Sequence, residues 1–109
     1  MKRFNIEGLD YAGAKARIKG NLEGLFASFN EGDMKAGRYI SLYYLMEAAE
    51  RGDITSQIAL ASLYEFGNIV GQDILEAKHW YAEAIEQDHP RQDGSMLAEN
   101  ASRAMERLG

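Results

Sequence analysis

The side chains that could do chemistry in this chain are two histidines and many carboxylates; there is no cysteine. On a helix, His79 and Glu83 would form a solvated pair four residues apart, whereas a metal site usually needs three or four convergent ligands. His89 precedes Pro90, where a helix is expected to end and an imidazolium suits the helix dipole. We therefore expect neither histidine to bind a metal or to act in catalysis.

Closely spaced carboxylates can perform acid–base chemistry when burial separates their pKa values. Glu47 and Glu50 are three residues apart, and so are Glu83 and Glu86. On amphipathic helices such pairs are more often solvated than catalytic. Because no set of nucleophile and base emerges either, the sequence predicts a protein that is not an enzyme and needs no cofactor.

Two segments flanked by glycines match known motifs only in part. Residues 67–71, Gly-Asn-Ile-Val-Gly, precede an expected helix, but they lack a preceding strand and the Gly-Lys-Ser/Thr ending of a phosphate loop. Gly20 and Gly24 have the spacing of a membrane helix-dimer motif, but their surroundings are polar. We interpret the first segment as a turn and the second as part of a surface helix.

Composition and charge exclude several classes of protein. No stretch approaches the roughly 20 apolar residues that cross a membrane. A net charge of −5 argues against nucleic acid as a ligand. Residues 1–20 carry a charge of +3 and residues 21–109 a charge of −8, which favours basic protein partners. Since residues 1–7 lack the apolar stretch of a secretory signal, we expect a cytoplasmic protein.

The elements expected to carry these residues are helices. Valine and proline each occur once, at Val70 and Pro90, and strands prefer β-branched residues, so the sequence predicts an all-α fold. A stripe at helical spacing in the first segment is formed by Ala14, Ile18, Leu22, Leu25, Phe26 and Phe29. Five helices are predicted: Tyr11–Asn30, Met34–Glu50, Asp53 to Phe66, Asp73 to a point before Pro90, and Ser95–Leu108.

The chain repeats itself at a spacing of about 36 residues. Leu60, Tyr64 and Gly67 lie 35 residues after Leu25, Phe29 and Gly32, and Trp80, Tyr81 and Ala84 lie 36 after Tyr44, Leu45 and Ala48. Repeats of this length predict a short α-solenoid, in which helical hairpins stack side by side and a terminal helix covers the end. We expect a single domain over residues 1–109, with a degenerate repeat at 10–52, a well-matched repeat at 53–90 and a capping helix at 93–109.

The second unit carries the residues of a known repeat. Its run Leu-Ala-Ser-Leu-Tyr-Glu-Phe-Gly at residues 60–67, followed by Val70, resembles the Sel-one-like repeat, a helical repeat similar to the tetratricopeptide repeat. The resemblance covers residues 53–88 well, although Ser56 and Ala61 stand where the family has alanine and glycine. The positions that would form the frame of the repeat are Leu60, Tyr64, Gly67, Asp73, Ala77, Trp80, Tyr81 and Ala84.

The resemblance implies a protein–protein interaction module, an adaptor or scaffold whose first helices line a concave binding face. One alternative is a small acidic bacterial immunity or inhibitor protein that blocks a cognate toxin or effector. Another is a structural protein that forms a homodimer, because two repeats bury little core. The residues predicted to contact a partner are Glu23, Ala27, Asn30, Ile58, Ser62 and Glu65.

Overall fold

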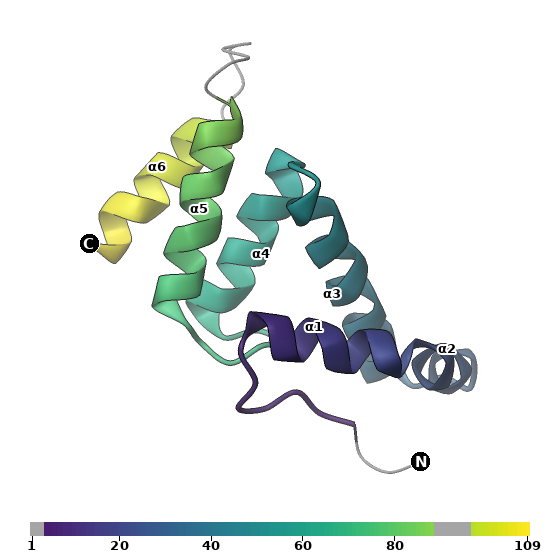
Figure 1. The fold of residues 1–109 in the computed structure, drawn as a ribbon. Coiled ribbons are helices and arrows are strands. Elements are labelled where there is room, and N and C mark those ends of the chain that lie inside the picture. The colour runs from purple at the N-terminus through teal and green to yellow at the C-terminus, as the bar shows by residue number, and fades with distance from the viewer. Residues whose placement is uncertain (1–3, 89–96) are drawn as a thin grey trace.

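The computed structural model describes residues 4–88 and 97–109, and over that part of the chain all regular structure is helical (Figure 1). The all-α fold class is thereby confirmed. None of the described helices combines the length and the apolar character needed to cross a membrane. The helices are α1 (Tyr11–Gly20), α2 (Leu22–Asn30), α3 (Met34–Glu50), α4 (Ile54–Phe66), α5 (Ile74–Asp88) and α6 (Leu97–Leu108).

Aspartate caps set the starts of four helices. The carboxylates of Asp10, Asp33, Asp53 and Asp73 accept backbone N–H hydrogen bonds in the first turns of α1, α3, α4 and α5, respectively. Such caps satisfy N–H groups that have no partner within the helix. The predicted starts at Asp53 and Asp73 are confirmed. Gly67 ends α4 with φ of +68°, a left-handed conformation that glycine adopts without steric cost.

The predicted helix over Tyr11–Asn30 is wrong as a single element, because the chain breaks it at Asn21. The backbone of Asn21 leaves the helical region, with φ of −121° and ψ of 12°. Its side-chain amide donates to the carbonyl oxygen of Arg17 at 2.7 Å, which satisfies an acceptor at the end of α1. Helix α2 consequently runs in a different direction from α1, as Figure 1 shows.

The last predicted helix is present as α6, which begins at Leu97. The predicted first residue, Ser95, lies outside the described residues, as do His89 and Pro90. Helix α6 buries Ala101 and Ala104 against its neighbours. It therefore covers the end of the helical stack, the place that the sequence analysis assigns to a capping helix.

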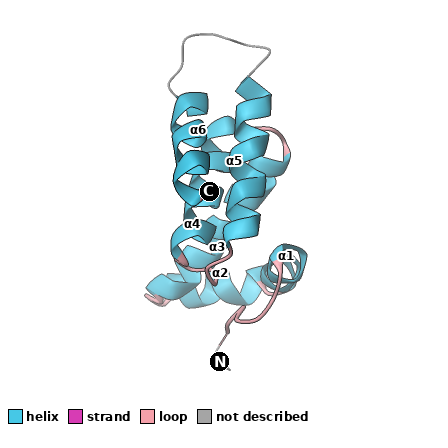
Figure 2. Cartoon of the chain, turned by 90° about the vertical axis from the view of Figure 1, so that its left-hand side faces the viewer, coloured by secondary structure: helices cyan, strands magenta, loops and turns pink. Residues whose placement is uncertain are grey.

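The helices lie side by side in chain order from α2 to α6, and α1 crosses the stack (Figures 1 and 2). Tyr11 on α1 shows how α1 is attached: its hydroxyl donates to Glu50 at the end of α3, and its ring lies 5.5 Å from that of Trp80 on α5. The molecule measures 46 × 26 × 21 Å. This elongated packing is consistent with a helical repeat.

The core follows the frame positions of the second unit. Small residues on α4, α5 and α6 bring the helix backbones close together, and aromatic rings fill the remaining gaps between them. The buried frame residues are Leu60, Tyr64, Ala77, Trp80, Tyr81 and Ala84.

Candidate functional site

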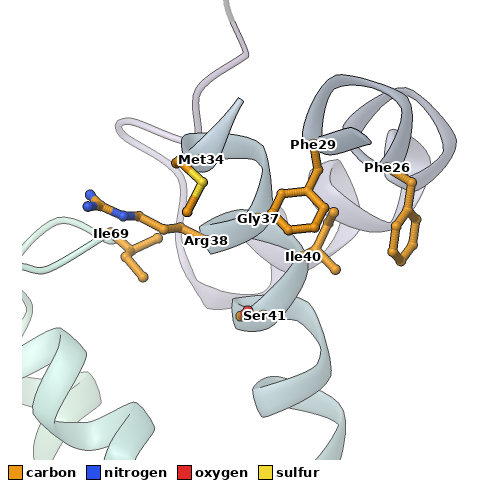
Figure 3. A pocket seen from close by; sticks show the side chains of 8 residues that line it. All are labelled: Phe26, Phe29, Met34, Gly37, Arg38, Ile40, Ser41 and Ile69. Carbon is orange, nitrogen blue, oxygen red and sulfur yellow. The ribbon is translucent and has the colours of Figure 1, made fainter. Parts of the chain in front are cut away.

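The most distinctive surface feature is an apolar groove between α2, the first half of α3 and the connection between α4 and α5. Its volume is about 530 Å³. Figure 3 shows two phenylalanines of α2 on one side, Ile69 on the other, and residues of α3 between them. The lining consists of Phe26, Phe29, Met34, Gly37, Arg38, Ile40, Ser41 and Ile69.

Large apolar side chains on the groove are unusually open to solvent. Phe26 and Phe29 are 41% and 42% exposed, and Met34 is 70% exposed. Single exposed apolar residues are common on protein surfaces, but several around one hollow are typical of a binding surface. The sequence predicts both phenylalanines in the apolar stripe of one long helix. The break at Asn21 leaves them on a short helix that packs on α3, with part of each ring uncovered.

A tight turn and a glycine determine where the Phe29 side chain lies. Residues 31–33 turn the chain from α2 into α3, with Gly32 at φ of +101° and Asp33 as the cap of α3. The ring of Phe29 then lies against Gly37, where a Cβ atom would be only 2.8 Å from two ring carbons. The missing side chain at Gly37 therefore makes the space that the ring occupies.

Ile69 forms the opposite wall in a conformation that β-branched residues rarely adopt. Its φ is +69°, and it is the only described non-glycine residue with a positive φ. Two hydrogen bonds hold the surrounding loop. The backbone amide of Asp73 donates to the Tyr64 carbonyl oxygen at 2.8 Å, and the side-chain amide of Gln72 donates to the Glu65 carbonyl oxygen at 2.8 Å. Backbone strain that persists in this way is concentrated at functional sites.

A second, more polar groove adjoins the first. Its volume is about 430 Å³, and it is lined by residues 4–8, Lys35, Tyr39, Ile69 and Gly71. Ile69 separates the two grooves and belongs to both. Lys35 and Arg38, one turn apart on α3, thus lie on adjoining surfaces, and among the described residues neither has an ion-pair partner.

The main cluster of ionisable side chains lies elsewhere, between α1 and α3. Lys15 contacts Glu47 at 3.1 Å and Glu50 at 2.7 Å, and Tyr43 donates to Glu47 at 2.9 Å. The hydrogen bond from Tyr43 and then that from Lys15 lower the pKa of Glu47. Burial, reinforced by the hydrogen bond to Glu50, raises the pKa of Tyr11 far above its usual range. The cluster fastens α1 to α3.

Five of the six residues predicted to contact a partner are at least partly exposed. Glu23, Ala27 and Asn30 are exposed on α2, next to the groove but not in its lining. Ile58 and Ser62 on α4 are partly buried, and Ile58 packs against the core.

Glu65 is the exception, because its side chain is buried within the fold. It is 5% exposed, and its carboxylate accepts hydrogen bonds from Tyr81 at 2.7 Å and from Arg107, with a shortest distance of 2.6 Å. Burial, followed by this hydrogen bond to Glu65, raises the pKa of Tyr81 to about 12. Glu65 therefore ties α4 to α5 and α6. No sequence signal links it to Arg107, 42 residues later.

The remaining frame positions have structural roles as well. Gly67 ends α4, and Asp73 caps α5, so that together they fix the ends of the loop that carries Ile69. Within the described residues, no group of three or more histidines and carboxylates is arranged to hold a metal ion. The groove is thus the candidate site.

Comparison with protein-family models, with curated proteins and with solved structures finds no match to this chain. The resemblance to the Sel-one-like repeat therefore stays a prediction from the residues of the second unit.

Proposed function

We propose that this chain is a non-enzymatic module that binds another protein, and that the apolar groove beside α2 and α3 is its contact surface. The observation that carries the proposal is the exposure of Phe26, Phe29 and Met34 around one hollow. Covering these side chains removes apolar area from water, the main favourable term in protein association. Aromatic side chains and methionine are enriched at such interfaces.

The site differs from the concave face that the sequence predicts. The predicted residues on α2 flank the groove, whereas Glu65 on α4 is occupied by Tyr81 and Arg107. The proposal therefore assigns recognition to the neighbouring face of α2, where Phe26 and Phe29 lie. Glu23, Ala27 and Asn30 would contact a partner only at the edge of the interface.

Affinity capture with matched variants tests this proposal. The tagged chain, a Phe26→Ser/Phe29→Ser variant and a Leu75→Ser control are compared in native lysate, and bound proteins are quantified by mass spectrometry. Leu75 is 79% exposed and does not line the groove, so the control also removes an exposed apolar side chain. Circular dichroism then checks whether each variant keeps its helices.

We expect one stoichiometric partner with the original chain and with the control, and a loss of at least about tenfold with the groove variant, the size typical of central aromatic contacts. Equal recovery by all three proteins would contradict the assignment to the groove. Absence of any stoichiometric partner would contradict the module itself.

A further inference from the structure

The charges beside the groove indicate what kind of protein segment fits it. Arg38 is the only charged residue in the lining, and the lining contains no carboxylate. Lys35 lies one turn before it on α3, in the lining of the adjoining groove, which also contains Glu7. Lys15, Arg103 and Arg107 form ion pairs within the fold, whereas other described cations, such as Arg51, do not. Among the described residues Arg38 forms none either, although the chain is acidic overall.

We propose that the groove binds an amphipathic helix of a partner protein, whose apolar side chains enter between Phe26, Phe29 and Ile69 and whose carboxylate pairs with Arg38. This inference rests on the proposed function and specifies the partner's chemistry. A guanidinium at the edge of an apolar surface forms its strongest contacts with a carboxylate, through two parallel hydrogen bonds.

We infer a helix as the occupant from the walls of the groove. The apolar walls are two packed helices, α2 and α3, and a third amphipathic helix can lie along them with side chains spaced three or four residues apart. A volume of about 530 Å³ is in the range of sites that bury a compact apolar ligand. On the exposed face of α3, the lining residues Met34, Arg38 and Ser41 follow this same helical spacing.

The acidic character of the segment departs from the basic partner that net charge alone favours. The screening length at physiological salt is about 8 Å, so charges that line a groove affect a bound segment more than distant ones do. The net charge of −5 is distributed over the whole chain, whereas Arg38 lies within the contact surface. The local cation therefore decides the sign of the preferred segment.

Selection from a displayed library of random peptides of about 16 residues, roughly four helical turns, tests the inference without a known partner. The original chain is the target, and selected peptides are then measured on the Arg38→Glu variant and on an Arg51→Glu control. Arg51 follows the last residue of α3, about 20 Å from Arg38 along the helix. Both variants change the net charge equally, so a general charge effect acts on both.

We expect enriched peptides with apolar residues at helical spacing and an excess of aspartate and glutamate. Their affinity should fall about tenfold with Arg38→Glu and stay unchanged with Arg51→Glu. Enrichment of neutral or basic peptides, or equal binding to both variants, would overturn the inference. If the capture experiment still shows loss of a partner with the phenylalanine variant, the proposed function stands while this inference fails.

A second copy of the chain is the main competing occupant. Sedimentation of the original chain and of the Phe26→Ser/Phe29→Ser variant distinguishes the two cases. A monomer in both supports a peptide from another protein. A dimer that dissociates in the variant would overturn the inference, because the groove would then be filled by the chain itself.

Discussion

At Ile69 the fold imposes a conformation that opposes the residue's own preference. A positive φ places the Cβ atom too close to the backbone, and branching at Cβ makes the cost larger. Hydrogen bonds from Asp73 and Gln72 to the carbonyl oxygens of Tyr64 and Glu65 join the two ends of the loop and hold the chain in place. In this conformation the Ile69 side chain lies between the two grooves and lines both of them.

The strain predicts an inverted order of stability for two small substitutions. Ile69→Gly and Ile69→Ala both remove the side chain, but only glycine adopts a φ of +69° at no steric cost. We expect the glycine variant to be more stable than the alanine variant by about 1 kcal/mol. At most positions the alanine variant is the more stable of the two. Urea denaturation measures the difference. A more stable alanine variant would show that the loop relaxes freely.

Gly37 is the second residue with a specific steric role. An alanine there favours the helix by about 1 kcal/mol, but its Cβ atom would lie 2.8 Å from the Phe29 ring. Since that ring is half exposed, we expect it to swing away while the fold remains stable. The thermal midpoint of Gly37→Ala should be unchanged or higher, and the Phe29 ring resonances should shift in the NMR spectrum. Unshifted ring resonances would contradict this account of the groove.

At the scale of elements, α1 is fastened to α3 by the Lys15 cluster. Burial lowers the pKa of Lys15, but its hydrogen bonds to Glu50 and Glu47 outweigh this effect and raise it overall. Hydrogen bonds from Lys15 and then from Tyr11 lower the pKa of Glu50. These carboxylates therefore stabilise the docked helix while they are ionised.

The sign of these shifts predicts a pH dependence. A carboxyl whose pKa is lowered by folding adds stability above its ordinary pKa near 4.5, and loses it as the pH falls through the folded value. The thermal midpoint of Lys15→Met should therefore lie below that of the original chain at neutral pH. The difference between the two thermal midpoints should narrow as the pH drops below about 4.5. A gap of constant size down to about pH 3 would contradict the role of the cluster.

Helix α6 depends on one buried carboxylate. Arg107→Met leaves Glu65 with Tyr81 as its remaining side-chain partner, and a buried charge that loses a partner is costly. We expect faster hydrogen exchange along α6 than along α3, and a thermal midpoint several degrees lower. Adding Glu65→Gln to the Arg107→Met variant should recover part of the lost thermal stability, because the buried position then carries no charge. Uniform exchange across all helices would contradict local detachment of α6.

The sequence predicts most of the elements but not the break at Asn21. Caps and stops such as Asp53 and Gly67 act locally, so they can be read directly from the residue types. The helical period of Ile18, Leu22 and Leu25 continues across the break, which hides it. The groove follows from that break, because it decides how much of Phe26 and Phe29 is covered. The burial of Glu65 depends on a residue 42 positions away, which no local pattern indicates.

The whole molecule is an elongated stack that α6 covers at one end and in which α2 packs on α3 toward the other. Six of the eight residues expected to form the frame of the second unit are buried, whereas the groove is lined mainly by residues of α2 and α3, in the first unit. We expect the first unit to carry recognition and the second to carry stability.

Site-specific photo-crosslinking in the native lysate tests this account most directly. A benzophenone amino acid replaces Phe29 in the groove or, as the control, Leu75 outside it, and the adducts are identified by mass spectrometry. The account predicts that one partner protein is crosslinked from position 29 and is absent from the adducts of position 75. The same adducts at equal yield from both positions, or none from position 29, would contradict it.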